Sequence, residues 1–256
     1  MVPQDNRTEG ERRFEAYLKA MGYPFEFEKP YPSKSRRPDY SVTLGSATYL
    51  FDVKDADPDV TPPGFSQLDP HPEIIERIKA GQKKFKEFKE FPCCVVMQNN
   101  GNVSAMFEEP TAVLGAMYGR IGFRVPLYVG DGPPTESAPT LGPEFTQGAW
   151  LQPNRNTRIS ALMTLRRIAV GKRRLRRIRQ DNLAMTFDDA HNLAGERFGA
   201  DYFEELRQGV IVWENVYARV PLPRDIFNGP YDERYGLDGN DMTRVFCGSA
   251  FEEFDQ

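Results

Sequence analysis

The chain of 256 residues is poor in the side chains that build disulfides, iron–sulfur clusters and zinc sites. It holds three cysteines, of which Cys93 and Cys94 are adjacent, and two histidines, His71 and His191. An odd, small number of thiols gives no disulfide framework and falls short of the thiolate set that an iron–sulfur cluster usually needs. So few histidines rule against metal sites built from several imidazoles. The adjacent cysteines lie in an apolar run and are interpreted as packing residues.

Long apolar runs are missing as well. No stretch approaches the roughly 20 apolar residues that span a bilayer, so we expect no membrane partner. Residues 1–7 have no apolar stretch behind them and do not predict a signal peptide. The composition, with 27% charged and 39% hydrophobic residues, is ordinary for a globular protein, and we expect a cytoplasmic location. The length fits one large domain or two small ones. We predict a single domain over residues 1–256, with a core at about 8–130 and additions at about 150–256.

The most informative stretch is a predicted β-hairpin in the first quarter of the chain. Extended runs over residues 40–44 and 48–53 meet around Gly45, a residue that favours tight turns. Asp39 stands just before the first run, so a short hairpin returns it to the neighbourhood of Asp52 in the second run. The sequence therefore predicts that two carboxylates meet at one point of a sheet.

A lysine joins this acidic pair. Side chains alternate between the two faces of a strand, so Lys54 shares a face with Asp52 while Val53 points into a core. Two carboxylates suit Mg²⁺, which prefers oxygen ligands and keeps several waters. A lysine beside the metal can orient or deprotonate an attacking water and offset developing negative charge. The set predicts phosphodiester hydrolysis with Mg²⁺ or Mn²⁺ as the cofactor.

The order Pro38-Asp39, twelve further residues and then Asp52-Val53-Lys54 resembles the PD-(D/E)XK nuclease superfamily. The resemblance covers residues 8–100. It implies that Asp39 and Asp52 are metal ligands, that the backbone carbonyl of Val53 is often another, and that Lys54 is the catalytic lysine. It also implies an α/β fold with a restriction-endonuclease-like core, in which a mixed central β-sheet is flanked by helices, here with C-terminal additions.

Residues 8–22 predict the first helix. Thr8 and Glu11 have the spacing of a capping box, and Gly22 marks the helix end. In the superfamily resemblance, a glutamate at the start of this helix commonly completes the metal site, and Glu11 fits that place. The alternative is that Glu11 only closes the capping box, and Glu15, one turn later, is the substitute candidate.

A second helix is predicted over residues 72–90 and a buried strand over 91–98. With an edge strand predicted within 23–32, the element order becomes α-β-β-β-α-β, which is the order of the superfamily core. Gln82 lies on the buried stripe of the second helix, where a polar side chain needs a partner. The resemblance implies support of the catalytic centre by Gln82, and the alternative is a bond to a backbone group. We expect most of the lysines of this helix to lie on its exposed face: Lys79, Lys83, Lys84, Lys86 and Lys89.

The acids that follow Lys54 are interpreted as turn caps, with contact to a second metal as the alternative: Asp55, Asp57 and Asp59. Beyond residue 100 the pattern predicts helical segments at 108–118 and 184–208, strands at 123–129, 159–165 and 209–220, and loops at 130–146 and 221–236.

Positive charge is concentrated in residues 166–179, although the net charge of the chain is −4. This stretch holds eight Lys or Arg and no acid, so the rest of the chain carries −12. Gly171 at its centre predicts a basic hairpin or arm, which is the footprint expected for phosphate backbones. The alternatives are a solvated face or pairing with the protein's own acids. Together with the basic loop before Asp39, the candidates for nucleic-acid contact are Arg36, Arg37, Arg166, Arg167, Lys172, Arg173, Arg174, Arg176, Arg177 and Arg179.

These features predict a divalent-metal-dependent nuclease that hydrolyses phosphodiester bonds of nucleic acid, with DNA favoured over RNA and an endonuclease favoured. A restriction or defence context is a family-level association. One alternative is a catalytically inactive nucleic-acid-binding module of the same fold, and another is an RNA-directed nuclease. A homodimer would suit the cutting of two strands.

Overall fold

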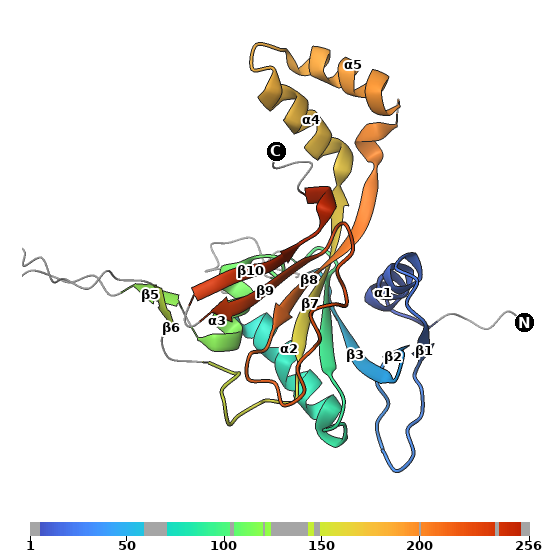
Figure 1. The fold of residues 1–256 in the computed structure, drawn as a ribbon, viewed down its shortest axis with the longest axis vertical. Coiled ribbons are helices and arrows are strands. Elements are labelled where there is room, and N and C mark those ends of the chain that lie inside the picture. The colour runs from blue at the N-terminus through green and yellow to red at the C-terminus, as the bar shows by residue number, and fades with distance from the viewer. Residues whose placement is uncertain are drawn as a thin grey trace, which may run out of the picture.

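A computed structural model describes residues 6–58, 71–102, 105–119, 121–123, 143–145, 149–199, 201–238 and 241–251. Its centre is a mixed sheet of eight strands in the order β1-β2-β3-β4-β7-β8-β9-β10 (Figure 1). The strands are β1 Phe25–Phe27, β2 Tyr40–Leu44, β3 Ala47–Ala56, β4 Cys93–Asn99, β7 Ala161–Ala169, β8 Leu206–Glu214, β9 Glu233–Asp238 and β10 Asp241–Cys247. A separate two-stranded sheet pairs β5 Ile121–Phe123 with β6 Pro143–Phe145.

The described helices flank the sheet or extend from it, so the predicted α/β class is confirmed. They are α1 Glu9–Ala20, α2 His71–Lys84, α3 Pro110–Tyr118, α4 Val170–Asp181 and α5 Phe187–Phe198, with short 3₁₀ turns at Phe85–Glu87 and Tyr202–Glu204. Within the described ranges, none of the helices combines the length and apolar character that a membrane crossing requires.

The first hundred residues follow the predicted order α1-β1-β2-β3-α2-β4. Strands β2 and β3 form the expected antiparallel hairpin, in which Tyr40 pairs with Phe51 and Gly45 turns the chain at a φ of 59°. Positive φ costs glycine little, which explains its place in this turn. Helix α2 then carries the chain to β4, which pairs parallel to β3, as a crossover helix must.

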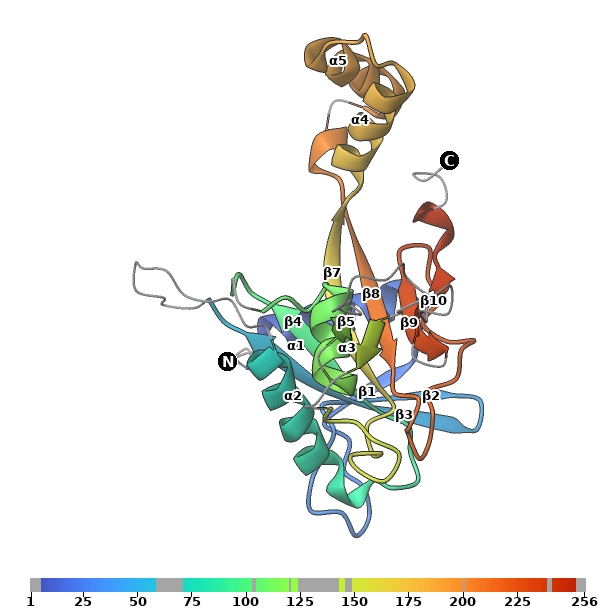
Figure 2. The ribbon, with the colours of Figure 1, turned by 90° about the vertical axis from the view of Figure 1, so that its left-hand side faces the viewer.

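Both faces of the sheet are covered. Helix α1 packs Phe14 and Leu18 against Phe51 and Val53 on one face. Helices α2 and α3 cover the other face, and the two helices α1 and α2 lie on opposite sides of the sheet in both views (Figures 1 and 2). The predicted alternation is confirmed, but the second face is no less buried than the first. The side chain of Asp52 therefore lies under α2, away from solvent.

The basic stretch lies in an arm that projects from the sheet. Strands β7 and β8 pair antiparallel from Ala161 with Glu214 to Ala169 with Leu206, and α4 and α5 form a helical hairpin between them (Figure 2). The arm has its own apolar cluster, made by Leu175, Ile178, Ala190, Ala194 and Tyr202. The predicted arm is thus present, but the chain does not turn at its central glycine. Gly171 lies in the first turn of α4, where a Cβ atom would stand 1.9 Å from the Tyr202 carbonyl oxygen.

Predictions for the last part of the chain were less accurate. The predicted strand 209–220 is β8, which begins and ends earlier, and the predicted helical segment ends before β8 begins at Leu206. The predicted loop 221–236 is wrong in its last residues, because β9 begins at Glu233. Strand β10 was not predicted. Of the predicted strand 123–129 only residue 123 is in β5, and the rest lies outside the described residues.

Candidate active site

The β2–β3 hairpin brings Asp39 beside Asp52, as the sequence predicts. Asp39 sits at the entry of β2, where its Oδ2 accepts a hydrogen bond of 2.7 Å from the backbone N–H of Val53. Asp52 is fully buried on the α2 face of β3. Lys54, two residues along the same face, donates to Asp52 Oδ1 at 2.8 Å and to the carbonyl of Val53 at 3.3 Å. All members of the predicted Asp-Asp-Lys set, with the Val53 carbonyl, therefore lie together.

A second lysine, which the sequence did not single out, lies between the two acids. Lys84 Nζ is 2.5 Å from Asp39 Oδ1 and 3.1 Å from Asp52 Oδ1, and its side chain is 26% exposed. Lys84 is therefore the exception among these lysines, because the other four are exposed as predicted. The signal that could have found it is spacing, because Lys84 follows buried Gly81 by three residues and precedes buried Phe88 by four.

Gly81 explains how Lys84 reaches the acids. Helix α2 passes so close to β4 that a Cβ atom on Gly81 would lie 2.2 Å from Cγ2 of Val95. Atoms of real proteins do not approach so closely, so only glycine permits this contact between helix and strand. The close approach lowers the last turn of α2 onto the sheet and sets Lys84 over the two carboxylates.

The four charged groups balance one another. Burial, and then the nearby carboxylate of Asp39, raise the pKa of Asp52, whereas Lys54 and Lys84 oppose that rise. Burial alone would lower the pKa of Lys84, but the carboxylates of Asp52 and Asp39 outweigh it, so the Lys84 pKa is raised. Two acids and two amines give no net charge in a site that water reaches poorly. Among the described residues, Asp52 Oδ2 has no hydrogen-bond partner.

The donor set fits a hard divalent cation. Asp39 and Asp52 aim one oxygen each at a single cationic nitrogen, which marks a point where positive charge is stabilised. The second oxygen of Asp52 is a further acceptor without a partner in the described chain. No group of three or more His, Cys, Asp or Glu that could hold a metal occurs among the described residues. Mg²⁺ typically takes one or two carboxylates and keeps its remaining ligands as water, so an acidic pair suffices.

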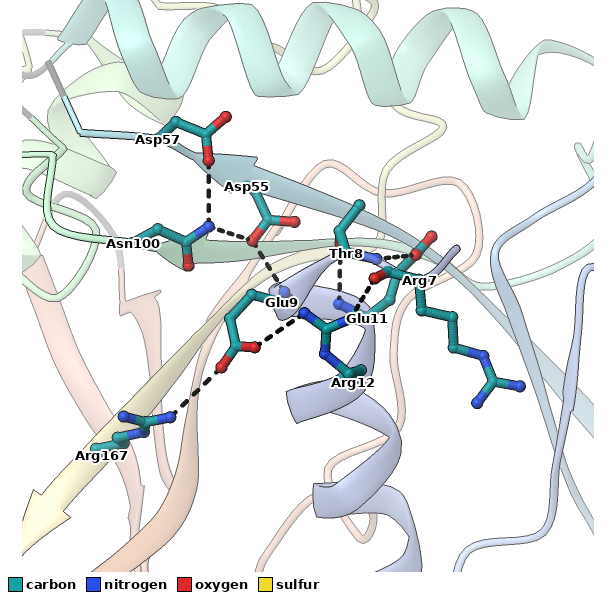
Figure 3. A network of polar contacts seen from close by, with 10 residues as sticks. Arg7, Thr8, Glu9, Glu11, Arg12, Asp55, Asp57, Asn100 and Arg167 are labelled. Carbon is teal, nitrogen blue, oxygen red and sulfur yellow. Dashed lines mark hydrogen bonds and ion pairs between the residues drawn. The ribbon is translucent and has the colours of Figure 1, made fainter. Parts of the chain in front are cut away.

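Glu11 lies apart from this cluster. Its carboxylate accepts a hydrogen bond of 2.8 Å from the backbone N–H of Thr8, and its own N–H donates to Thr8 Oγ1 at 3.2 Å (Figure 3). The capping box is confirmed, and it belongs to α1, which covers the face opposite to Asp52. The substitute candidate Glu15 is engaged as well, in ion pairs of 2.6 Å with Arg7 and with Lys19. The structure brings neither glutamate to the two aspartates.

Gln82 also faces elsewhere. Its Nε2 donates a hydrogen bond of 2.8 Å to the backbone carbonyl of Asn156. This is the alternative foreseen from the sequence, a bond to a backbone group, and it leaves Gln82 outside the acidic cluster.

A polar network links the end of β3 to the start of the arm (Figure 3). Asp55, the residue after Lys54, accepts hydrogen bonds of 2.9 Å from the N–H of Gly10 and from Asn100. A carboxylate at a helix N-terminus is favourable, so Asp55 acts as a cap of α1. It does so from within β3, so the prediction that it caps a turn after the strand is wrong. Glu9 in the same helix turn pairs with Arg167 of β7 at 3.4 Å. Asp59 lies outside the described residues.

Most of the predicted basic residues line the arm. Lys172, Arg176 and Arg179 are exposed, and their spacing places them along one side of α4. A groove of about 470 Å³, here called the polar groove, runs beside α4 and is lined by Arg166, Arg167, Lys172, Arg173 and Arg176 together with one acid, Glu108. Two further arginines of α4 pair with acids of the arm: Arg174 with Glu205 and Arg177 with Asp181.

Arg166 is a correction to the predicted contact set. It is buried, forms an ion pair with Glu233, and donates to the backbone carbonyl of Tyr231 at 3.1 Å. Its guanidinium links β7 to β9 across β8 and binds the turn before β9. Arg166 also lines the polar groove, but its charge is already paired with Glu233, so we expect it to hold the fold and not to be a main phosphate contact. Arg36 and Arg37 lie in the loop before β2; Arg37 is exposed and Arg36 is half-buried.

Comparisons with family models, with curated proteins and with solved structures find no match to this chain.

Proposed function

We propose that this protein is a divalent-metal-dependent nuclease with a restriction-endonuclease-like core, which hydrolyses phosphodiester bonds of DNA. The observation that carries the proposal is the convergence of Asp39, Asp52 and Lys54 at one point of the sheet, in the order and spacing of the PD-(D/E)XK pattern. Asp52 lies level with Val95 and Leu162, near the start of β7, and the basic arm continues from the other end of β7. The arm therefore supports a polyanionic substrate through its exposed positive charge, and not through closeness to the carboxylates.

The residues have separable tasks in this proposal. Asp39 and Asp52, with the Val53 carbonyl, would hold Mg²⁺ or Mn²⁺, which when bound polarises the phosphate and makes a water more acidic. Lys54 is 28% exposed, so its ammonium group can reach substrate from its place beside Asp52. There it would orient the attacking water and offset the charge that develops as the phosphorus–oxygen bond breaks. The exposed lysine and arginine side chains of the arm, together with Arg37, would bind the phosphate backbone without recognising its base sequence.

A second candidate function is a nucleic-acid-binding module without catalysis. The observation in its favour is Lys84, which already bridges both carboxylates with a cation supplied by the chain. A cluster neutralised in this way could serve the fold alone. DNA is favoured over RNA, which is the alternative substrate. A homodimer would suit the cutting of two strands, and a restriction or defence role is the family-level association.

The experiment is cleavage of supercoiled plasmid by wild-type protein, by Lys54→Ala and by the control Lys83→Ala, which removes an exposed lysine of α2 outside the cluster. We expect nicking or linearisation in Mg²⁺ or Mn²⁺, none in EDTA, loss in Lys54→Ala and retention in Lys83→Ala. A closed circle has no ends, so cutting also identifies an endonuclease. Failure on plasmid, linear DNA and RNA alike would overturn the nuclease and favour the binding module.

A further inference from the structure

A second groove lies on the other side of α4 and differs in character from the polar groove. It has a volume of about 450 Å³ and is here called the apolar groove; α4 contributes Leu175, the turn before α5 contributes Leu183, and Phe187 and Phe203 line it as well. Its volume falls within the range of about 300–1,000 Å³ that is typical of ligand sites. Leu183 is 90% exposed and Phe187 is 52% exposed, so apolar surface here is left open to solvent.

The apolar groove is bordered by positive charge. The Lys172 ammonium lies 5.6 Å from the ring centre of Phe203, and the Arg179 guanidinium lies 6.0 Å from that of Phe187. Arg176 also lines the groove. Aromatic faces beside cations are the combination that holds a flat, electron-rich ring next to an anionic group.

The two grooves share residues of α4. Lys172, Arg176 and Gln180 line both of them, so this part of α4 is a cationic ridge with a polar hollow on one side and an apolar hollow on the other. A nucleic-acid strand whose phosphates follow the ridge can place its bases in the apolar groove only if those bases are unpaired. A paired duplex keeps its bases stacked inside the helix, where Leu183 and Phe187 cannot reach them.

We propose that the apolar groove of the α4–α5 arm binds the bases of single-stranded or locally unpaired nucleic acid, with Lys172, Arg176 and Arg179 on its phosphates. The inference rests on the proposed nucleic-acid substrate and narrows it to strands with unpaired bases. An acidic amphipathic peptide would fill an apolar groove too, but it would not require the cationic ridge to continue into the polar groove.

The test is fluorescence anisotropy in EDTA, which measures binding without cleavage. The probes are a fluorescein-labelled single DNA strand and the same strand annealed to its complement. Phe187→Ala removes one aromatic wall and no charge, and Phe187→Trp restores a ring. Phe198→Ala is the matched control, because Phe198 is an exposed ring of the same helix, at 43%, that does not line the groove. Unchanged circular dichroism and melting temperature show that each variant is folded.

We expect Phe187→Ala to weaken single-strand binding by about 5- to 160-fold, the loss typical of one stacked base, with duplex binding unchanged. Phe187→Trp should restore the affinity, and Phe198→Ala should not alter it. Phe187→Ala removes no charge, so the slope of the logarithm of the binding constant against the logarithm of salt concentration should not change. Arg176→Ala removes one phosphate contact and should reduce the magnitude of that slope by about 0.7.

Two results would overturn the inference. One is that Phe187→Ala loses affinity equally for the single strand and for the duplex, and the other is that Phe187→Ala binds the single strand within twofold of wild type. The latter result would leave a peptide as the occupant of the groove. The two proposals fail separately: a protein that cuts plasmid without this selective loss refutes only the groove, and one that shows the loss but never cuts refutes only the nuclease.

Discussion

Lys84→Met removes the ammonium group that bridges Asp39 and Asp52 while keeping the length of the side chain. Removing one partner of a buried ion pair typically costs about 3–5 kcal/mol, because the remaining charge stays buried. Here Asp52 is fully buried but still pairs with Lys54, and Asp39 still accepts a hydrogen bond from the Val53 N–H. The expected cost therefore lies at the low end of this range. We expect a loss of about 3 kcal/mol in the free energy of unfolding at pH 7 in EDTA, which corresponds to roughly 6–12 °C in melting temperature.

The pH dependence of this loss has a definite sign. The pKa of Asp52 in the folded protein lies above its ordinary value of 3.8, and the loss of Lys84 raises it further. A carboxyl group whose pKa is higher in the folded than in the unfolded protein destabilises the fold as pH rises from the unfolded pKa through the folded pKa. Acidification toward these pKa values should therefore reduce the difference in unfolding free energy between Lys84→Met and wild type. The Lys84 pKa is raised above 10.5, so its contribution is complete below that pH and is lost as pH rises beyond it.

The assay is urea denaturation at pH 7 and at pH 5, with Lys83→Met as the control for removal of an exposed lysine from the same helix. Added Mg²⁺ provides a further comparison. Under the proposed function it should stabilise Lys84→Met by about 2.7 kcal/mol at a hundredfold excess over the dissociation constant of that variant, and should stabilise the control less, because the control keeps the competing Lys84 ammonium. Equal stability of Lys84→Met and Lys83→Met in EDTA would refute the reasoning, because the buried carboxylates would then not depend on this cation.

Three further substitutions test how the site and the arm are held. Gly81→Ala would force α2 away from Val95. We expect it to lose about 1–3 kcal/mol of unfolding free energy from overpacking, offset by up to about 1 kcal/mol gained in helix propensity. A Gly81→Ala protein as stable as wild type in urea denaturation would contradict the close contact. Arg166→Met should cost about 3 kcal/mol of stability by leaving Glu233 buried, whereas Arg176→Met should change stability by less than about 0.5 kcal/mol and weaken nucleic-acid binding. If Arg166→Met instead kept its stability and weakened nucleic-acid binding, while Arg176→Met was destabilised, Arg166 would be a nucleic-acid contact and not a structural residue.

The parts of the site that the sequence predicted are those fixed by short-range rules. The alternation of side chains along a strand puts Lys54 beside Asp52, and a tight turn at Gly45 returns Asp39 to them. These relations need only the hairpin itself. Lys84, by contrast, lies 45 residues from Asp39 in the sequence and reaches it only because α2 docks closely on β4. That docking depends on the packing of a whole helix, which no local pattern encodes.

The same distinction explains the errors elsewhere. In the sequence, Arg166 belongs to a run of basic residues, which predicts an exposed side chain. Its partner Glu233 is 67 residues away, so no local pattern indicates that Arg166 is buried in an ion pair. Strands β9 and β10 are rich in polar residues and are joined by a segment with Gly and Asn, so their sequence resembles a loop. They are strands because the edge of β8 offers hydrogen-bonding groups, as the parallel pairing of Val212 with Arg234 shows.

The order of strands in the large sheet has a consequence for how the chain acquires its fold. From β1 to β10, with β5 and β6 set apart in their own sheet, each strand lies beside the strand that precedes it in the sequence. No strand has to insert between two that are already paired. During synthesis from the N-terminus, a chain of this topology can extend the sheet by adding each new strand to the free edge left by the last one. Translation and sheet growth then run in the same direction, so a pause in synthesis leaves a smaller sheet with one growing edge and no gap in its middle.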